Sequence, residues 1–230
     1  MSIAEKLTTV AENQQKVYDA GKEAQYDQFW DAFQNYGERT DYSYAFYRGY
    51  SDANFYPKYD LNVVIPNGVH SYTFANNTIT DLKGRLEECG VKLNTENNTR
   101  FSYMFYGNRQ LTHVPELDMR NANYIVSMFS ANSALHTIDK LILSESGLAV
   151  DLTFTGCLKL ENIVIEGKIA ANINMSACPL TAASVQSIID ALKDLTGSTT
   201  KTLTFKSDVG AALTDTQKAT ITAKNWTLAY

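Results

Sequence analysis

The sequence predicts an α/β fold: a solenoid with a long N-terminal helix and a C-terminal helix-strand cap. Three observations predict it: a pattern that recurs from Phe105 to Cys178, an amphipathic N-terminal stretch, and helix and strand signals that alternate near the C-terminus. Repeats of about 20 to 29 residues, such as those of this stretch, stack and bury a shared core. The predicted regions are 1–37 (helix), 38–69 (aromatic-rich cap), 70–180 (repeats) and 181–230 (C-terminal cap).

The first region, 1–37, has the pattern of one long helix. Ser2 and Glu5 form an S-x-x-E capping box, and Gly37 supplies a C-terminal cap. In between, spacings of four and three place a narrow stripe on one face. A stripe this narrow suits a partner helix, so it is a candidate oligomerisation or docking surface, and packing on the chain's own domain is the alternative. The stripe comprises Ile3, Leu7, Val10, Gln14 and Val17.

The second region, 38–69, gathers aromatic residues in an otherwise polar segment. Tyrosine combines a rigid apolar ring with a polar hydroxyl, which suits wet interfaces. Two interpretations stay open: a cap over the end of the repeats, or a platform that binds a sugar or a protein. The candidate binding residues in this region are Tyr42, Tyr44, Tyr47 and Tyr50.

The repeats of region 70–180 each begin with an aromatic residue or Met. Phe105, Phe129, Phe154 and Met175 follow one another at steps of 24, 25 and 21 residues, after a degenerate first coil at Phe74. These steps lie within or near the period of about 20 to 29 residues that is typical of leucine-rich repeats. The prediction is therefore a leucine-rich-repeat solenoid.

Three residues after each repeat start comes an Asn or a Cys. A buried corner in a coil leaves backbone donors and acceptors that need partners. Asn can satisfy both kinds, and Cys fits as a small, weakly hydrogen-bonding hydrophobe. Stacked coils would form a structural ladder, which gives two of the three Cys a role without redox or metal chemistry. The ladder comprises Asn77, Asn108, Asn132, Cys157 and Cys178.

Alternation within the repeats predicts short parallel strands. Val114, Ile138 and Ile163 are expected to point inward and their neighbours outward. The outward positions form a mixed polar surface without convergent chemistry, which is either a binding face or solvated surface. The candidate binding residues on it are His113, Thr137, Asp139, Asn162 and Glu166.

The last region, 181–230, predicts a helix, a strand, a second helix and a second strand. Thr181 is placed to cap a helix whose apolar stripe runs to Leu195 and stops at Gly197. The strands are TKTLTFKS and NWTLAY, and the helix between them starts at a capping box formed by Thr214 and Gln217. This unit would close the C-terminal end of the stack.

Composition and motifs argue against several classes of function. The net charge of −5 carries no block of like charges, so nucleic acid is not an expected partner. No apolar run is long enough for membrane insertion, and the N-terminus lacks a secretory signal, so we expect synthesis in the cytoplasm. Motifs of hydrolases, nucleotide-binding proteins and metalloproteins are absent, so no enzyme, catalytic residue, metal or cofactor is predicted.

The repeats resemble a known family. FYGNRQLTHV, FSANSALHTI and FTGCLKLENI are similar to the FxGCxxLxxI pattern of BspA-type leucine-rich repeats, which are common in bacterial surface proteins. Asn replaces the Cys of that pattern at positions 108 and 132. The N-terminal stretch, the aromatic segment and the NWTLAY ending resemble such proteins encoded by phages and prophages of Firmicutes.

This resemblance implies a non-enzymatic virion or tail-associated protein with a structural or receptor-binding role. Its implied partners are further copies of itself or other virion proteins, together with a protein or glycan on the host surface. The implied location is the virion. The alternative is a bacterial cell-surface adhesin of BspA type, and the resemblance assigns no binding residue in either case.

Overall fold

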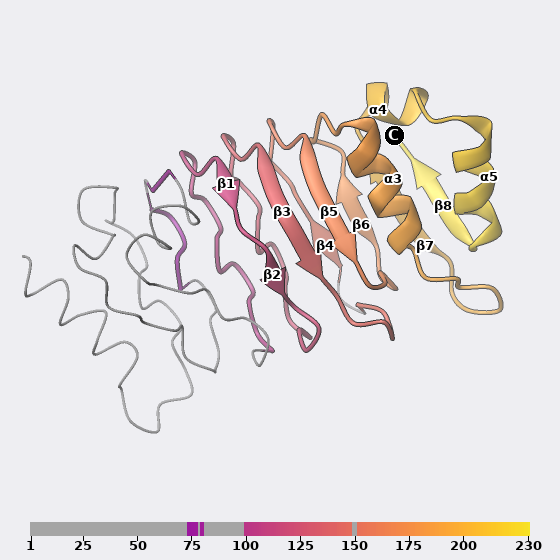
Figure 1. Ribbon diagram of the computed structural model, residues 1–230, viewed down its shortest axis with the longest axis horizontal. Coiled ribbons are helices and arrows are strands. Elements are labelled where there is room, and N and C mark those ends of the chain that lie inside the picture. Colours follow the sequence, from indigo (N-terminus) through magenta and orange to yellow (C-terminus); the bar gives the residue numbers. More distant parts are fainter. Residues whose placement is uncertain (1–72, 78, 81–98, 149–150) are drawn as a thin grey trace, which may run out of the picture.

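The computed structural model describes residues 73–77, 79–80, 99–148 and 151–230 (Figure 1). Two groups of predicted residues lie outside these ranges. They are the stripe of the N-terminal helix (Ile3, Leu7, Val10, Gln14 and Val17) and the tyrosines of the aromatic segment (Tyr42, Tyr44, Tyr47 and Tyr50).

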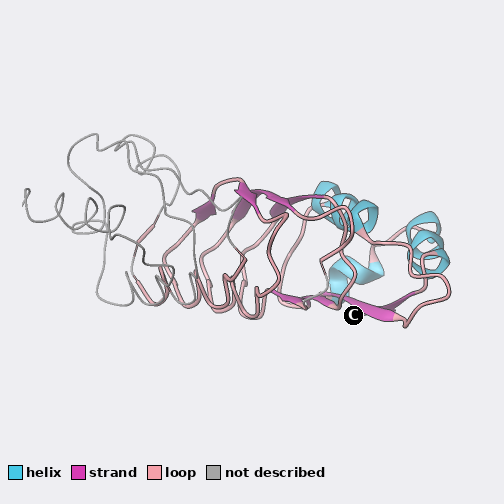
Figure 2. Cartoon of the chain, turned by 90° about the horizontal axis from the view of Figure 1, so that it is seen from below, coloured by secondary structure: helices cyan, strands magenta, loops and turns pink. Residues whose placement is uncertain are grey.

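The described chain forms two small, four-stranded parallel sheets, which lie on opposite sides of its long axis (Figure 2). The first sheet has the order β1-β3-β2, with β5 also paired to β3. The second has the order β4-β6-β7-β8. The strands of the first are β1 (His113–Val114), β2 (Leu117–Asp118), β3 (Thr137–Ile142) and β5 (Asn162–Glu166). Those of the second are β4 (Leu152–Thr153), β6 (Ile173–Met175), β7 (Lys201–Phe205) and β8 (Trp226–Ala229).

The predicted fold class is wrong. The leucine-rich-repeat solenoid is replaced, in the part of the chain that the structure describes, by these two sheets and three short helices, and the predicted helix 1–37 lies outside that part. The helices are α3 (Ala182–Ala191), α4 (Ser207–Ala211) and α5 (Asp215–Ala223). The steps of 24, 25 and 21 residues are unequal, and the strands divide between two sheets instead of adding to one. Pro115, which cannot donate to a strand ladder, lies where β1 and β2 separate.

The repeat starts do pack on one another in the core. Phe74, Phe105, Phe129 and Phe154 are fully buried, and each ring stacks on the next at centroid distances of 5.9, 5.9 and 5.5 Å. Such aromatic pairs contribute about 0.5 to 1.5 kcal/mol each beyond their burial. The stack therefore holds four successive chain segments side by side. Val114, Ile138 and Ile163 are buried as well.

The Asn and Cys residues lie beside this stack and bind backbone carbonyls. Asn108 Nδ2 donates to the carbonyls of Phe74 (2.8 Å) and Phe105 (3.0 Å), while its Oδ1 accepts from the backbone amide of Asn77 (2.7 Å). Asn132 Nδ2 donates to the Phe129 carbonyl, but its buried Oδ1 has no hydrogen-bond partner among the described residues.

The two buried Cys residues continue the same row. Cys157 Sγ donates to the Phe129 carbonyl at 2.9 Å. Cys178 Sγ lies 4.0 Å from the Phe154 carbonyl. Both thiols are free, so sulfur takes the place of the side-chain amide in the later segments without forming a disulfide.

Helix caps in the C-terminal region confirm two predictions from the sequence. Thr181 Oγ1 accepts from the Ser184 amide at the start of α3, and Thr214 and Gln217 form a complete capping box on α5. The predicted end of α3 is wrong. The helix stops at Ala191, because Leu192 turns to extended backbone and forms a parallel bridge with Ile169.

Helix α3 closes one edge of the first sheet. It lies beside β5 (Figure 1), where a further strand would otherwise pair. Ser184 Oγ accepts from the Ile163 amide at 2.9 Å, and Ser187 Oγ accepts from the Ile165 amide at 2.8 Å. Two serine hydroxyls thus replace the hydrogen bonds of a strand and end the sheet at β5.

Candidate binding site

The outward face of β1, β3 and β5 carries a polar surface whose shape depends on a β-bulge. Ile138 pairs with Ile163 and Leu141 with Ile165, so two residues of β3 stand opposite the single Val164 of β5. The two are Asp139 and Lys140, which are both partly exposed between buried neighbours. A bulge redirects side chains in this way. The charges of two consecutive residues therefore reach the same surface.

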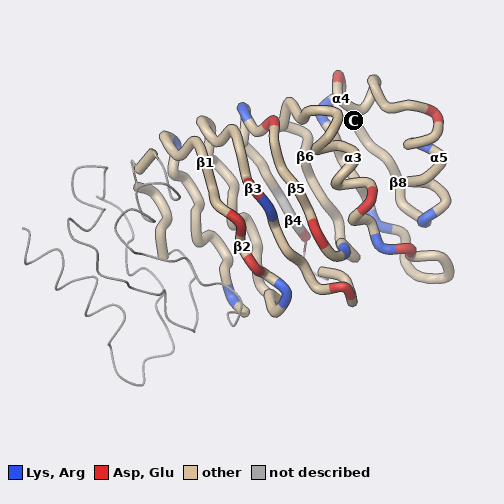
Figure 3. Tube along the Cα trace, viewed as in Figure 1, with Lys and Arg blue, Asp and Glu red and all other residues tan. Residues whose placement is uncertain are grey.

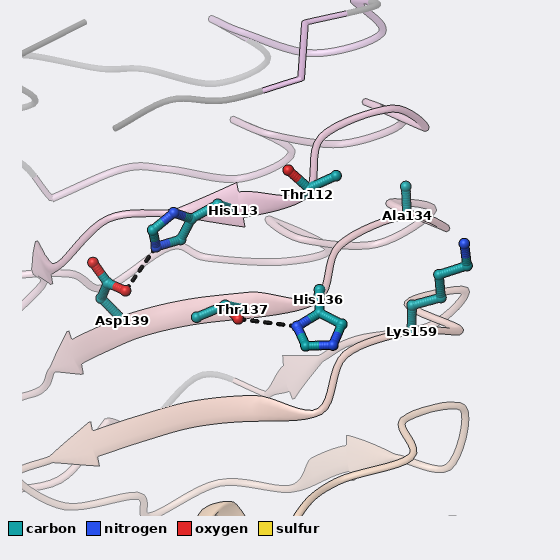
Figure 4. A pocket seen from close by; sticks show the side chains of 7 residues that line it. All are labelled: Thr112, His113, Ala134, His136, Thr137, Asp139 and Lys159. Atoms are coloured by element: carbon teal, nitrogen blue, oxygen red, sulfur yellow. Dashed lines mark hydrogen bonds and ion pairs between the residues drawn. The ribbon is translucent and has the colours of Figure 1, made fainter. Parts of the chain in front are cut away.

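His113 and Asp139 form a pair between two strands. His113 Nε2 on β1 lies 2.7 Å from Asp139 Oδ1 on β3 (Figure 4), and each side chain is about 30% exposed. The sequence predicted both residues on this face. The structure adds that they contact each other, which fixes the direction of both side chains.

His136 lies between a hydroxyl and a carboxylate. Its Nδ1 is 3.2 Å from Thr137 Oγ1, and its Nε2 is 3.2 Å from Glu161 Oε2. A neutral imidazole that donates from Nε2 and accepts at Nδ1 satisfies both contacts. The order of hydroxyl, imidazole and carboxylate is also that of catalytic triads. However, the His136 and Glu161 side chains are 49% and 45% exposed, and such catalysis needs a site that excludes water.

Lys140 joins three segments of the chain. Its Nζ lies 3.1 Å from Glu116 Oε2 and 3.4 Å from Glu166 Oε2. The hydrogen bond to Glu116, followed by the charge of that carboxylate and the contacts of Glu166, raises the pKa of Lys140. Glu166 was a predicted member of this face. Lys140 was missed because strict alternation would turn it inward.

Part of this surface is hollowed into a shallow, open pocket of about 530 Å³. Figure 4 shows the His113–Asp139 pair at one end and Lys159 at the other, with His136 and Thr137 between them. Asn162 and Glu166 are on β5, but they do not line it. The lining comprises Thr112, His113, Ala134, His136, Thr137, Asp139 and Lys159.

Two lining residues were missed although the repeats contain a signal for them. Ala134 and Lys159 both come two residues after a ladder position, at Asn132 and Cys157. Equivalent repeat positions lie side by side in the fold, so one pocket residue at this position indicates the other. His136 and Glu161 carry the same kind of signal, because they come seven residues after Phe129 and Phe154.

Neither metal chemistry nor thiol chemistry is visible on this face. The described ranges contain no group of three His, Cys, Asp or Glu side chains that could hold a metal ion. Cys157 and Cys178 are buried in the core, where desolvation raises the pKa of Cys157 to about 12 and that of Cys178 well above its usual range. Neither thiol is therefore a nucleophile at neutral pH.

No protein-family model, no curated protein and no solved structure matches this chain. None of the described helices has the length and apolar character needed to cross a membrane. The function of the chain is therefore inferred from the chemistry of its polar face.

Proposed function

We propose that this chain is a non-enzymatic, virion- or tail-associated protein that contacts a protein or glycan through the outward face of β1, β3 and β5. One observation carries the proposal. The polar side chains of this face are held by pairs that run between neighbouring segments: His113 with Asp139, His136 with Glu161, and Lys140 with two glutamates. Side chains already fixed in position lose less conformational entropy when a ligand binds.

Exposure favours binding over catalysis on this face. Proton transfer and nucleophilic attack gain most from a dry pocket in which charges are poorly screened. The pocket here is open to solvent, and the side chains of its one hydroxyl-imidazole-carboxylate chain are about half exposed at His136 and Glu161. Recognition of a hydrated partner has no such requirement, because wet polar contacts can bind well.

The position in a phage particle is supported by the resemblance of the N-terminal stretch, the aromatic segment and the NWTLAY ending to phage-encoded proteins. The alternative of a BspA-type adhesin on the bacterial surface uses the same face for binding. Immunogold electron microscopy distinguishes the two. Antibodies against the chain are applied to an induced lysate and to intact cells of the strain that encodes it.

The proposal expects gold particles on virions or tails. Label confined to intact cell envelopes would replace it with the adhesin alternative. Label on neither, when the chain is detected in the same lysate by immunoblotting, would contradict both locations. Antibodies preabsorbed with the purified chain serve as the control.

A further inference from the structure

We propose that the pocket between β1 and β3 binds an acidic saccharide, with a carboxylate of the sugar at Lys159 and its hydroxyl groups at Asp139 and His113. This inference rests on the proposed function and names the chemical class of ligand. The three residues lie at the two ends of one pocket (Figure 4), so a ligand of sugar size can contact both ends.

Lys159 is the one lysine or arginine among the lining residues, and its ammonium group can contact a ligand. It is exposed, and it forms no ion pair or hydrogen bond with any residue in the described ranges. Lys140, by comparison, is occupied by Glu116 and Glu166. An ammonium group with three donors and no partner suits an anionic group on a ligand.

Asp139 and His113 supply the complementary chemistry at the other end. A carboxylate has about four acceptor sites, so Asp139 can accept from hydroxyl groups of a sugar in addition to its contact with His113. When neutral His113 donates from Nε2 to Asp139, its Nδ1 becomes an acceptor. Two acceptors held close together match adjacent hydroxyl groups of a sugar ring, each of which can donate.

The composition of the lining favours a saccharide over a peptide anchor. Protein partners bind mainly through large aromatic or aliphatic side chains that enter apolar pockets. Here Ala134 is the one aliphatic side chain, and the other six lining residues are polar or charged. The volume of about 530 Å³ lies in the usual range for small ligands, about 300 to 1,000 Å³.

The test is a titration of the full chain with trigalacturonate and with neutral galactotriose, with dissociation constants measured from amide chemical shifts by NMR. We expect the acidic sugar to bind about two- to fivefold more tightly at low salt, as one exposed ion pair allows. The preference should fall as salt is added. Lys159→Gln should abolish the preference, so that the two sugars bind with similar dissociation constants.

Matched variants keep the result interpretable. Lys218→Gln, on α5 and away from the pocket, should retain the preference. Asp139→Asn should weaken both sugars about tenfold, since it removes an acceptor that both use, and its melting temperature checks that it folds. Equal binding of the two sugars, or a preference that survives Lys159→Gln, would overturn the inference. If neither sugar binds while the chain still adheres to host envelopes through this face, the inference fails and the proposed function stands.

Discussion

At the scale of single residues, side chains at equivalent positions of the repeat make different hydrogen bonds. Within the described ranges, the Asn108 side chain makes three hydrogen bonds to neighbouring backbone, whereas that of Asn132 makes one and leaves its Oδ1 without a partner. The carbonyl that Asn132 binds also accepts from Cys157. The sequence pattern treats the two positions as equal, but the contacts make Asn108 the more important of the two for stability.

Replacing Asn108 should therefore cost more than replacing Asn132. Asn108→Leu strips the Asn77 backbone amide and the Phe105 carbonyl of a buried side-chain partner, and we expect a loss of about 2 to 3 kcal/mol in unfolding free energy. Asn132→Leu should cost about 1 kcal/mol or less, because Phe129 keeps its bond from Cys157. Urea denaturation measures both, and equal losses would show that these side-chain contacts are not the cause.

A left-handed backbone position recurs two residues after each stacked Phe. Gly107 and Gly156 adopt φ of 73° and 80° there, and Ala131 adopts 63°. This conformation costs an L-residue roughly 1 to 2 kcal/mol, which glycine avoids at some expense in entropy. Ala131→Gly should therefore stabilise the chain by about 0.5 to 1 kcal/mol, seen as a higher urea midpoint.

The reverse change is the control for this prediction. In Gly107→Ala, the new Cβ would clash with Asn76 Oδ1 as well as strain the backbone, so the midpoint should fall. A midpoint that falls in Ala131→Gly would mean that the Ala131 methyl group contributes more than its backbone costs.

Burial of the thiols predicts a loss of stability in alkali. A thiol titrates near pH 8.5 in an unfolded chain, but Cys157 has a pKa of about 12 in the folded protein. Below about pH 8.5 both states hold the proton. Above it the unfolded state loses the proton first, so the unfolding free energy falls from about pH 8.5 towards pH 12.

Comparison with a variant isolates this effect from other alkaline titrations. Cys157→Ala with Cys178→Ala should show a shallower decline in the urea midpoint between pH 8 and pH 10.5 than the unsubstituted chain. Parallel declines would indicate that the thiols are not protected by burial. In the folded chain at pH 8, both thiols should also react with a thiol reagent only after denaturant is added.

At the scale of elements, local sequence patterns predict where the C-terminal helices begin, but not where α3 ends or where the first sheet has its bulge. The caps at Thr181 and at Thr214 with Gln217 follow from residue types at fixed spacing, so the sequence predicts them. The end of α3 at Ala191 depends on a bridge between Leu192 and Ile169, which are distant in sequence. The bulge at Asp139 likewise depends on the register of a partner strand.

The two serines of α3 give this edge a direct test. Ser184→Ala and Ser187→Ala should each lower the unfolding free energy by about 1 to 3 kcal/mol, because the Ile163 and Ile165 amides lose their partners. Ser184 should be the more costly, since its side chain is buried and also donates to the Glu161 carbonyl. Ser198→Ala, at an exposed turn, is the control. Losses no larger than the control would mean that the edge is held by packing alone.

At the scale of the whole molecule, the charged residues are spread over the described chain without a patch of one sign (Figure 3). The polar face differs from the rest of this surface because its charged side chains pair between neighbouring segments. The aromatic residues that stack are those at which the predicted repeats start, because a recurring apolar position reports on the core. It did not predict two sheets, because sheet membership depends on which residues of neighbouring segments align. His113, Thr137 and Asp139 were predicted on the face, whereas Lys159 and Glu161 were missed, although they stand at the repeat positions of Ala134 and His136.

Binding of the labelled full chain to envelopes of the bacterial host tests whether the face of β1, β3 and β5 is the contact surface. Two double variants are compared. The first combines His113→Ala with Asp139→Ala, and the second, the control, removes the exposed ion pair of Lys206 and Asp208 at α4. If the face of β1, β3 and β5 is the contact surface, the first variant should lose at least about tenfold in affinity, while the control and the circular dichroism of both stay unchanged. Equal binding by the two variants would contradict the account.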